Sequence, residues 1–203
     1  MEPPPSVTVR AATPDDRDPI LAVVRAAFGT DGRDGAEEVD IVRTTWAMDD
    51  AVRSGDRAND DRATGPVIPD GLELVAVDDG SGEVVGHVLS ALATLDGRQV
   101  PAIAPLAVAP AHQGAGVGSA LMTEVVRRAD AGGFPLLVLL GNPAYYGRFG
   151  FEPAGPLGIV YPPAGAGSPY FQACRLRAYD SGWRGAVTYC WERRPIDIGD
   201  DTT

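Results

Sequence analysis

The sequence predicts an α/β (α+β) fold, a single domain over residues 1–203 whose mixed, mostly antiparallel central sheet is flanked by helices. Three observations predict it. A chain of 203 residues suits one domain. Three successive strand patterns separated by tight turns predict an antiparallel meander. A glycine-rich loop then opens an amphipathic helix between two apolar strands, which predicts one parallel crossover.

The N-terminal quarter predicts a strand followed by two helices. "SVTVRAA" (6–12) alternates and is rich in β-branched residues, as strands are. "TPDDRDPILAVVRAAFG" (13–29) carries Pro14 in its first turn, early aspartates and a closing glycine, which are helix boundary signals. A second helix is predicted over "GAEEVDIVRTTWAM" (35–48) from its apolar spacing.

The segment 49–70 is polar, acidic and interrupted by Gly and Pro. We expect it to contain the end of the second helix and then a mobile loop insertion, because long loops are usually functional lids or lack structure. The acidic end, 194–203, is expected to be a flexible tail.

The middle of the chain predicts the meander. Its strands are "LELVAVD" (72–78), "VVGHVLSAL" (84–92) and "VPAIAPLAVAP" (100–110). Prolines in the third strand predict a bulge or a split from its neighbour, since proline cannot donate to a strand ladder.

The rest of the chain predicts a helix, a strand, a short helix and two strands. The first helix is "GAGVGSALMTEVVRRADAGG" (114–133), and the apolar run "PLLVLLG" (135–141) reads as a central strand covered on both faces. "NPAYYGRFGF" (142–151) predicts a short helix and turn, and strands are predicted at 170–178 and 185–193.

The composition narrows the function. A formal net charge of −11 argues against nucleic acid or an anionic membrane as partner and is compatible with a cationic substrate such as an amine. There is no apolar run long enough to span a membrane and no signal-peptide pattern at the start, so we expect a cytoplasmic protein. The two histidines and two cysteines show no metal-ligand spacing, and we expect no metal.

The stretch "HQGAGVGSAL" (112–121) has three phosphate-binding interpretations. A P-loop is excluded because all 17 basic residues are arginine and the motif needs a lysine. A dinucleotide fingerprint fits poorly, because the spacing is G-x-G-x-G and no acidic residue closes the following strand. A Q-x-x-G-x-G loop remains, in which backbone N–H groups at a helix start hold an anion.

The segments "PLAVAPAHQGAGVGSAL" and "GNPAYYGRFGFEPA" together resemble the GNAT superfamily of acyl-CoA-dependent N-acetyltransferases. The second segment is similar to a bacterial branch with a P-A-Y-Y-x-R-F-G-F signature. The resemblance implies acetyl-CoA as cosubstrate and direct attack by a primary amine of a small molecule or peptide. A homodimer is one possible assembly.

The resemblance also implies the cofactor-binding residues. The pyrophosphate of CoA would meet the loop and helix start, with Gly116 and Gly118 permitting close approach, and the pantetheine arm would run along the preceding strand. The residues so implied are Leu106, Ala107, Val108, Gln113, Gly114, Ala115, Gly116, Val117, Gly118, Ser119 and Asn142. A helix N-cap would explain Asn142 equally well. One departure is Gly114, which stands where family loops often carry a basic residue.

The catalytic residues are expected from the same resemblance. Tyr146 matches the tyrosine that protonates the departing thiolate, while Tyr145 is expected to pack with its aromatic neighbours. The base that deprotonates the amine is left open. His87 is one candidate, as base or relay, although its alternation with Val85 and Leu89 on one strand face favours a core histidine. The other candidates are Glu37, Glu38, Asp40, Glu73 and Asp96.

Two other function classes remain open at this point. One is a non-catalytic acyl-CoA-binding or regulatory module that keeps the loop without a base. The other is a nucleotide-dependent oxidoreductase that uses the glycine loop, which the spacing favours less.

Overall fold

The computed structural model describes residues 6–29, 33–55, 66–165 and 167–192. The helices in these ranges are α1 (Arg17–Phe28), α2 (Ala36–Ser54), α3 (Val117–Ala131) and α4 (Pro143–Tyr146). The strands are β1 (Val7–Ala11), β2 (Glu73–Asp78), β3 (Val84–Leu95), β4 (Arg98–Val108), β5 (Leu136–Leu140), β6 (Phe151–Pro153), β7 (Ile159–Val160), β8 (Phe171–Arg175) and β9 (Gly185–Thr188).

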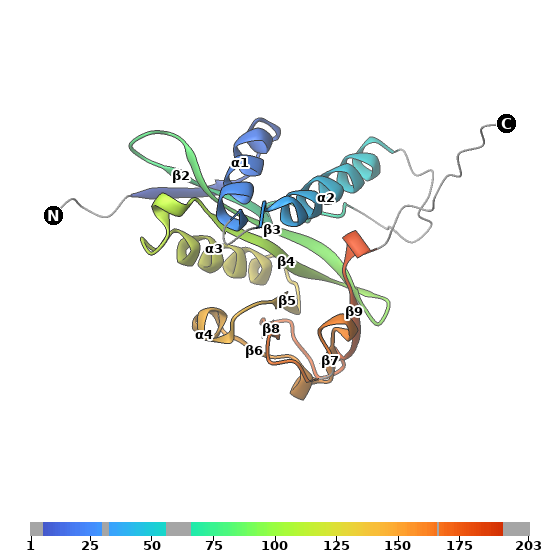
Figure 1. Cartoon of the computed structure of the whole chain (residues 1–203). Coiled ribbons are helices and arrows are strands. Elements are labelled where there is room, and N and C mark those ends of the chain that lie inside the picture. The colour runs from blue at the N-terminus through green and yellow to red at the C-terminus, as the bar shows by residue number, and fades with distance from the viewer. Residues whose placement is uncertain (1–5, 30–32, 56–65, 166, 193–203) are drawn as a thin grey trace.

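The strands form one mixed sheet in the order β1-β2-β3-β4-β5-β8-β6, and β9 pairs with both β3 and β7. Neighbours are antiparallel except β4–β5 and β7–β9. The predicted fold class and the parallel crossover through α3 are therefore confirmed. Helices α1 and α2 lie on one face of the β1–β4 half, and α3 lies on the other (Figure 1).

Strands β4 and β5 separate soon after they meet. Their ladder consists of Ala102↔Val138 and Ile103↔Leu139 alone, although β4 continues to Val108. Pro105 lies in the diverging part and has no N–H to donate. The predicted split is confirmed, and it leaves one edge of β4 without a β5 partner beside the loop that follows.

Both sides of the sheet have apolar cores. The α3 side is built from residues such as Leu121, Met122 and Val125 against β2 and β3. The α1–α2 side packs Val24, Val42 and their neighbours against the opposite face. Burial of these side chains, at roughly 25 cal/mol per Å² of apolar surface, fixes the helices on the sheet.

Some predicted boundaries differ from the structure. As expected, the segment 49–70 contains the end of the second helix, since α2 continues to Ser54. Val67 and Ile68 are already buried before β2 begins. Residues 56–65 of that loop, and the predicted tail 194–203, lie outside the described residues. Strand β3 extends to Leu95, because its far end pairs with β9 as well as β4.

The C-terminal part is also arranged differently from the prediction. The short strands β6 and β7 were not predicted. The last strand, β9, ends at Thr188 instead of 193 and does not pair with β8. Two or three residues of pairing are too short to leave a periodic signal in the sequence. Among the described helices, none is long and apolar enough to cross a membrane.

Candidate functional site

The glycine loop adopts a backbone that only glycine takes readily. Gly114 has φ +76 and Gly116, the N-cap of α3, has φ +90. A Cβ at either position would meet no described atom within 4 Å, so space does not explain the glycines. Left-handed φ does explain them. The first N–H groups of α3 have no partner inside the helix, as at any helix start, and can therefore bind an anion.

The side chain of Gln113 fastens the loop to the end of β4. Its Nε2 donates to the carbonyl oxygen of Val108 at 3.0 Å. This contact accounts for a glutamine at position 113 without any need for a bound ligand, because it closes the turn between β4 and α3. The amide therefore shapes the loop, and the backbone beyond it remains available.

A pocket of about 430 Å³ opens between this loop, the end of β4 and α4. Eight of the eleven predicted cofactor-binding residues line it: Leu106, Val108, Gln113, Gly114, Gly116, Val117, Gly118 and Ser119. Ala107 does not, because its side chain is buried on the opposite face against α1 and α2. Ala115 and Asn142 are also outside the lining, and Asn142 Oδ1 accepts from Ala144 N at 2.9 Å as the cap of α4.

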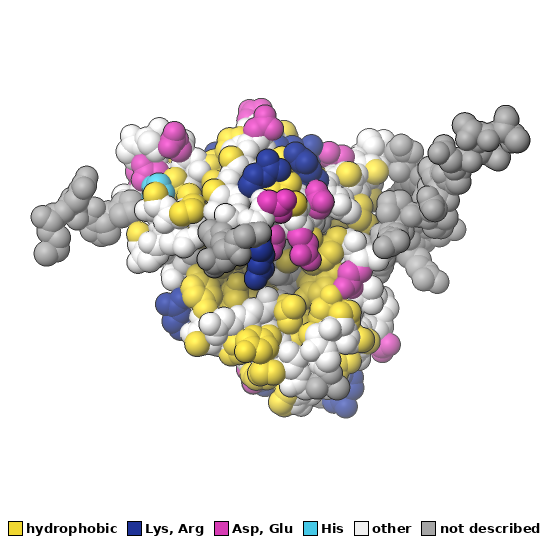
Figure 2. All heavy atoms as spheres, in the orientation of Figure 1, with side chains coloured by type: hydrophobic (Ala, Val, Ile, Leu, Met, Phe, Trp, Pro, Cys, Tyr) yellow, Lys and Arg dark blue, Asp and Glu magenta, His cyan; other side chains and the backbone are white. Residues whose placement is uncertain are grey.

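The lining of the pocket also includes residues that the sequence analysis did not identify as cofactor-binding. Ala27 and Phe28 at the end of α1 contribute one wall, and Tyr145 and Arg148 contribute another. Figure 2 shows a hollow in the middle of the molecule with hydrophobic side chains beside it. Tyr145 was predicted to pack only. It does contact the Phe149 ring, with centroids 5.6 Å apart, but it also reaches the pocket.

Arg148 is the arginine of this pocket lining. Its guanidinium lies 4.6 Å from the centroid of the Tyr145 ring, and its Nε donates to the Tyr145 carbonyl at 3.2 Å. In the described part of the chain it forms no ion pair with a carboxylate. The remaining N–H donors are therefore available for an anion in a fixed orientation. Arg148 is the arginine of the segment "PAYYGRFGF", but its place in that segment alone does not predict that it lines a pocket.

Tyr146 lies beside the pocket and not in its lining. Its ring packs on Gly141, directly after β5: a Cβ on residue 141 would collide with ring atom Cε2 and come within 3.2 Å of Cζ. The ring also contacts Phe151. Burial raises the pKa of Tyr146 to about 12, because the phenolate would be poorly solvated there. The phenol is thus protonated at neutral pH.

His87 is fully buried and lines neither pocket. Its Nε2 lies 3.0 Å from Oε1 of Glu73, which also accepts from Trp46 Nε1 at 2.8 Å. Its Nδ1 is buried and has no partner among the described residues. A substrate therefore cannot touch the ring directly. The position is that of a core histidine, and of the two catalytic roles expected for His87 it leaves only the relay.

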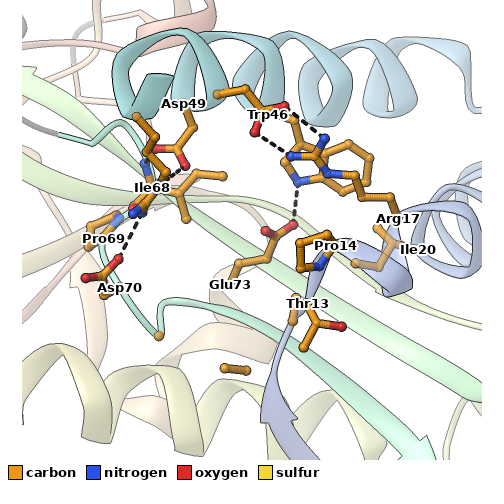
Figure 3. A pocket seen from close by; sticks show the side chains of 15 residues that line it. Thr13, Pro14, Arg17, Ile20, Trp46, Asp49, Ile68, Pro69, Asp70 and Glu73 are labelled. Carbon is orange, nitrogen blue, oxygen red and sulfur yellow. Dashed lines mark hydrogen bonds and ion pairs between the residues drawn. The ribbon is translucent and has the colours of Figure 1, made fainter. Parts of the chain in front are cut away.

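Glu73 instead faces a second pocket, of about 260 Å³, at the other end of α1 and α2 (Figure 3). There Arg17 pairs with Asp50, and Arg53 bridges Asp49 and Asp70. These pairs form an ion-pair network that joins α1, α2 and the segment before β2. The lining still carries more carboxylates than arginines, because Arg17 and Arg53 face Asp49, Asp50, Asp70 and Glu73.

The remaining base candidates lie elsewhere. Asp96 is in the β3–β4 turn, with φ +47, at the end of β4 opposite to the glycine loop. Glu37, Glu38 and Asp40 lie in the first turns of α2, where Glu38 is half-buried and the other two are exposed. Within the described ranges, no three His, Cys, Asp or Glu side chains gather as a metal site.

Residues 41–151, more than half of the chain, match the model of the acetyltransferase (GNAT) family. Two curated relatives from Escherichia coli K12 are similar: the uncharacterized N-acetyltransferases YjhQ, 40% identical over 86 residues, and YhbS, 39% identical over 83 residues. Each match covers 40% of this chain and 48% or 49% of the relative. The chain thus spans about half the length of the curated relatives it matches.

Solved structures share the architecture over most of the chain. E. coli YhbS in complex with CoA superposes with a TM-score of 0.71 and 28% identity, covering 93% of this chain and 92% of YhbS. A GNAT family acetyltransferase from Brucella melitensis in complex with acetyl-CoA gives a TM-score of 0.64 and 27% identity, covering 91% and 96%. Both similar structures therefore hold CoA or its acetyl thioester.

Proposed function

The chain belongs to the GNAT family of acetyltransferases, and we propose that it transfers the acetyl group of acetyl-CoA to a primary amine of a small molecule or peptide. The observation that carries the proposal is the pocket between the α3 start and α4. There a glycine-dependent backbone exposes N–H groups beside Arg148, which has no carboxylate partner among the described residues. CoA and acetyl-CoA in the two similar structures support the same ligand. We also propose membership of the branch with the P-A-Y-Y-x-R-F-G-F signature.

In this proposal the pyrophosphate of CoA sits at the N-terminus of α3. The N–H groups from Gly114 to Ser119 would donate to its oxygens, and the helix dipole favours the negative charge. Arg148 would supply the cation that Gly114 lacks. An arginine stacked on an aromatic ring loses less freedom on binding than an extended one, so it suits a phosphate.

The pantetheine arm would follow the edge of β4 that has separated from β5. The backbone there has N–H and C=O groups without a ladder partner, which an extended amide chain can pair with as an added strand does. The arm would bring the thioester to the point where the strands diverge. A backbone N–H of the 106–108 stretch would then stabilise the oxyanion.

The reaction itself needs no covalent enzyme intermediate. The nitrogen of the neutral amine attacks the thioester carbon, and the carbonyl π electrons move to oxygen. Collapse of that oxyanion breaks the C–S bond, and Tyr146 gives its proton to the leaving thiolate. The phenolate recovers a proton from solvent, and the nitrogen loses its extra proton. A protonated phenol at neutral pH is the required starting state.

For the amine proton, we propose that His87 and Glu73 act as a buried relay and that neither touches the substrate. The motivation is their 3.0 Å contact together with the unpartnered Nδ1 of His87 among the described residues. A neutral imidazole can take a proton on one nitrogen and release one from the other.

A non-catalytic CoA-binding module is the second candidate, because no described carboxylate lines the CoA pocket as a direct base. Isothermal titration with CoA and with NADP⁺ tests the ligand that both candidates share. We expect CoA to bind with a micromolar or tighter Kd and NADP⁺ to give no heat. Binding of NADP⁺ without CoA would overturn both candidates in favour of an oxidoreductase.

A further inference from the structure

Gln172 is a fully buried polar residue in the middle of β8. On one side β8 pairs with β5, where Gln172 stands opposite Leu139, and on the other with β6. The side-chain Nε2 donates to the carbonyl oxygen of Gly141 at 2.9 Å and reaches that of Tyr170 at 3.4 Å. Two carbonyl neighbours fix which end of the amide is the NH₂ group, since only a donor can bind them.

The other end of the same amide is unsatisfied. Oε1 of Gln172 is buried and has no hydrogen-bond partner among the described residues. Buried polar atoms are nearly always paired, because leaving one unpaired costs stability. Methionine has about the same length and volume and carries no such cost. Packing alone therefore does not account for a glutamine here, whereas its donor group has a definite target.

That target, Gly141, is the first residue after β5 and is held at both of its backbone polar groups. Its N–H donates to Tyr170 O at 2.8 Å, and its carbonyl accepts from Gln172. On its open side lies the Tyr146 ring, and the hydroxyl-bearing atom Cζ would be 3.2 Å from a Cβ at this position. The ring edge of Tyr146, from Cδ2 to Cζ, thus rests on a backbone that Gln172 fixes.

We propose that Gln172 is a positioning residue for Tyr146. It holds Gly141 at the end of β5, and Gly141 forms the surface against which the phenol sits. The inference rests on the proposed role of Tyr146 as proton donor. It adds a residue from β8 that does not line the cofactor pocket.

The test measures acetyl-CoA-dependent thiol release with the most active member of an amine panel containing spermidine, tyramine and a dipeptide. Gln172→Met should lower kcat by about tenfold, since small displacements of a reacting group are costly, and leave KM for acetyl-CoA within twofold. Gln99→Met, the same exchange at an exposed position of β4, is the matched control and should change neither.

A double-mutant cycle with Tyr146→Phe separates positioning from general damage. In the Tyr146→Phe background, which has no phenol to place, Gln172→Met should cause no further loss of kcat. A full further loss, or a rise in KM with kcat unchanged, would overturn the inference. The inference would also be overturned if Gln172→Met kept its kcat while Tyr146→Phe lost kcat. An unchanged kcat in Tyr146→Phe would instead remove the proposed proton donor itself, and this inference with it.

A second variant addresses the same contact from the other side. Gly141→Ala places a methyl group against the Tyr146 ring and leaves Gln172 intact. If Gln172→Met does not fold, as judged by circular dichroism, Gly141→Ala decides the question. Its loss of kcat should also disappear in the Tyr146→Phe background, and a loss that persists there contradicts the positioning role.

Discussion

The hydroxyl oxygen of Tyr145 lies 2.5 Å from the point where a Cβ on Gly118 would stand. Gly118 was predicted to let a phosphate approach the backbone. Gly118 does line the pocket. Tyr145 fills the side where its Cβ would stand, so the missing side chain also lets α4 pack against α3, while Gly114 and Gly116 serve the loop conformation.

Gly118→Ala should therefore damage the α3–α4 contact. We expect the free energy of unfolding in urea to fall by roughly 1–3 kcal/mol, as for an overpacked contact, and CoA affinity to fall with it. Tyr145→Phe added to Gly118→Ala should recover part of the stability, because it removes the clashing oxygen. Gly147→Ala, where a Cβ meets no described atom within 4 Å, is the control. Equal stability in Gly118→Ala and Gly147→Ala would refute the steric account.

Arg148→Ala should weaken CoA binding by about tenfold, in line with loss of one charge-assisted contact. The loss should shrink as salt is added, because screening weakens the interaction that was removed. Arg43→Ala, which removes one exposed arginine from α2, should leave the Kd unchanged. Titration of each variant with dephospho-CoA identifies the phosphate: a loss confined to CoA assigns Arg148 to the 3′-phosphate. Identical Kd values for Arg148→Ala and wild type would exclude the arginine from the site.

Tyr146→Phe should lower kcat by about ten- to a hundredfold, a modest general-acid effect. Because burial raises the pKa of this phenol to about 12, it should stay protonated and active up to at least pH 10. The kcat of the wild type should therefore show no decline caused by this group between pH 7 and 10. A loss of kcat below pH 10 that is absent from Tyr146→Phe would contradict this assignment.

His87→Gln tests the relay. If the ring passes the amine proton to Glu73, we expect kcat to fall by about tenfold with KM for acetyl-CoA unchanged. Glu73→Gln should lower kcat by a similar factor, and the double variant should lower kcat little further, because the two groups act in series. If the variants lose only melting temperature and keep kcat, the pair is structural.

Asp16→Asn tests how much the Asp16 carboxylate, at the start of α1, contributes to stability. Arg10 binds the Asp16 carboxylate through two N–H···O contacts of 2.7 and 2.8 Å, and Thr13 adds its N–H and hydroxyl. The Arg10 contact above all holds the pKa of Asp16 well below its usual range. The stabilisation is therefore full above about pH 4, the ordinary Asp pKa, and is lost as the pH falls further.

At pH 7 Asp16→Asn should cost roughly 1–3 kcal/mol of unfolding free energy, measured in urea. The difference from the wild type should narrow at pH 3 and below. A difference that stays constant between pH 7 and pH 2.5 would show that the carboxylate charge contributes nothing.

Much of the architecture was readable because its signals are periodic. The helices α1 and α3 have apolar stripes, and β5 is an uninterrupted apolar run, so each was predicted within a few residues. The end of α2 was expected within 49–70, but its position at Ser54 was not, because Asp49, Asp50 and Arg53 look like loop residues. Their partners Arg17, Ile68 and Asp70 come from other segments, and no local pattern reveals such pairs.

The candidate site was partly readable for the same reason. The loop from Gln113 to Ser119 is one contiguous motif, and motif and structure agree on where it lies. Arg148 joins the loop only through folding. The buried contact of His87 with Glu73 also forms only through folding, between residues 14 apart on neighbouring strands, and it lies outside the loop's pocket. Gln172 had no sequence signal at all, because a single glutamine in an apolar strand acquires meaning only from the carbonyls around it.

The most direct measurement of the central claim is amine-dependent release of free thiol from acetyl-CoA, with mass spectrometry of the amine. We predict that at least one amine of the panel raises thiol release well above the rate of hydrolysis and gains one acetyl group, and that Tyr146→Phe slows both equally. If the protein binds CoA but no amine raises thiol release or becomes acetylated, it is a CoA-binding module and the proposed reaction is wrong.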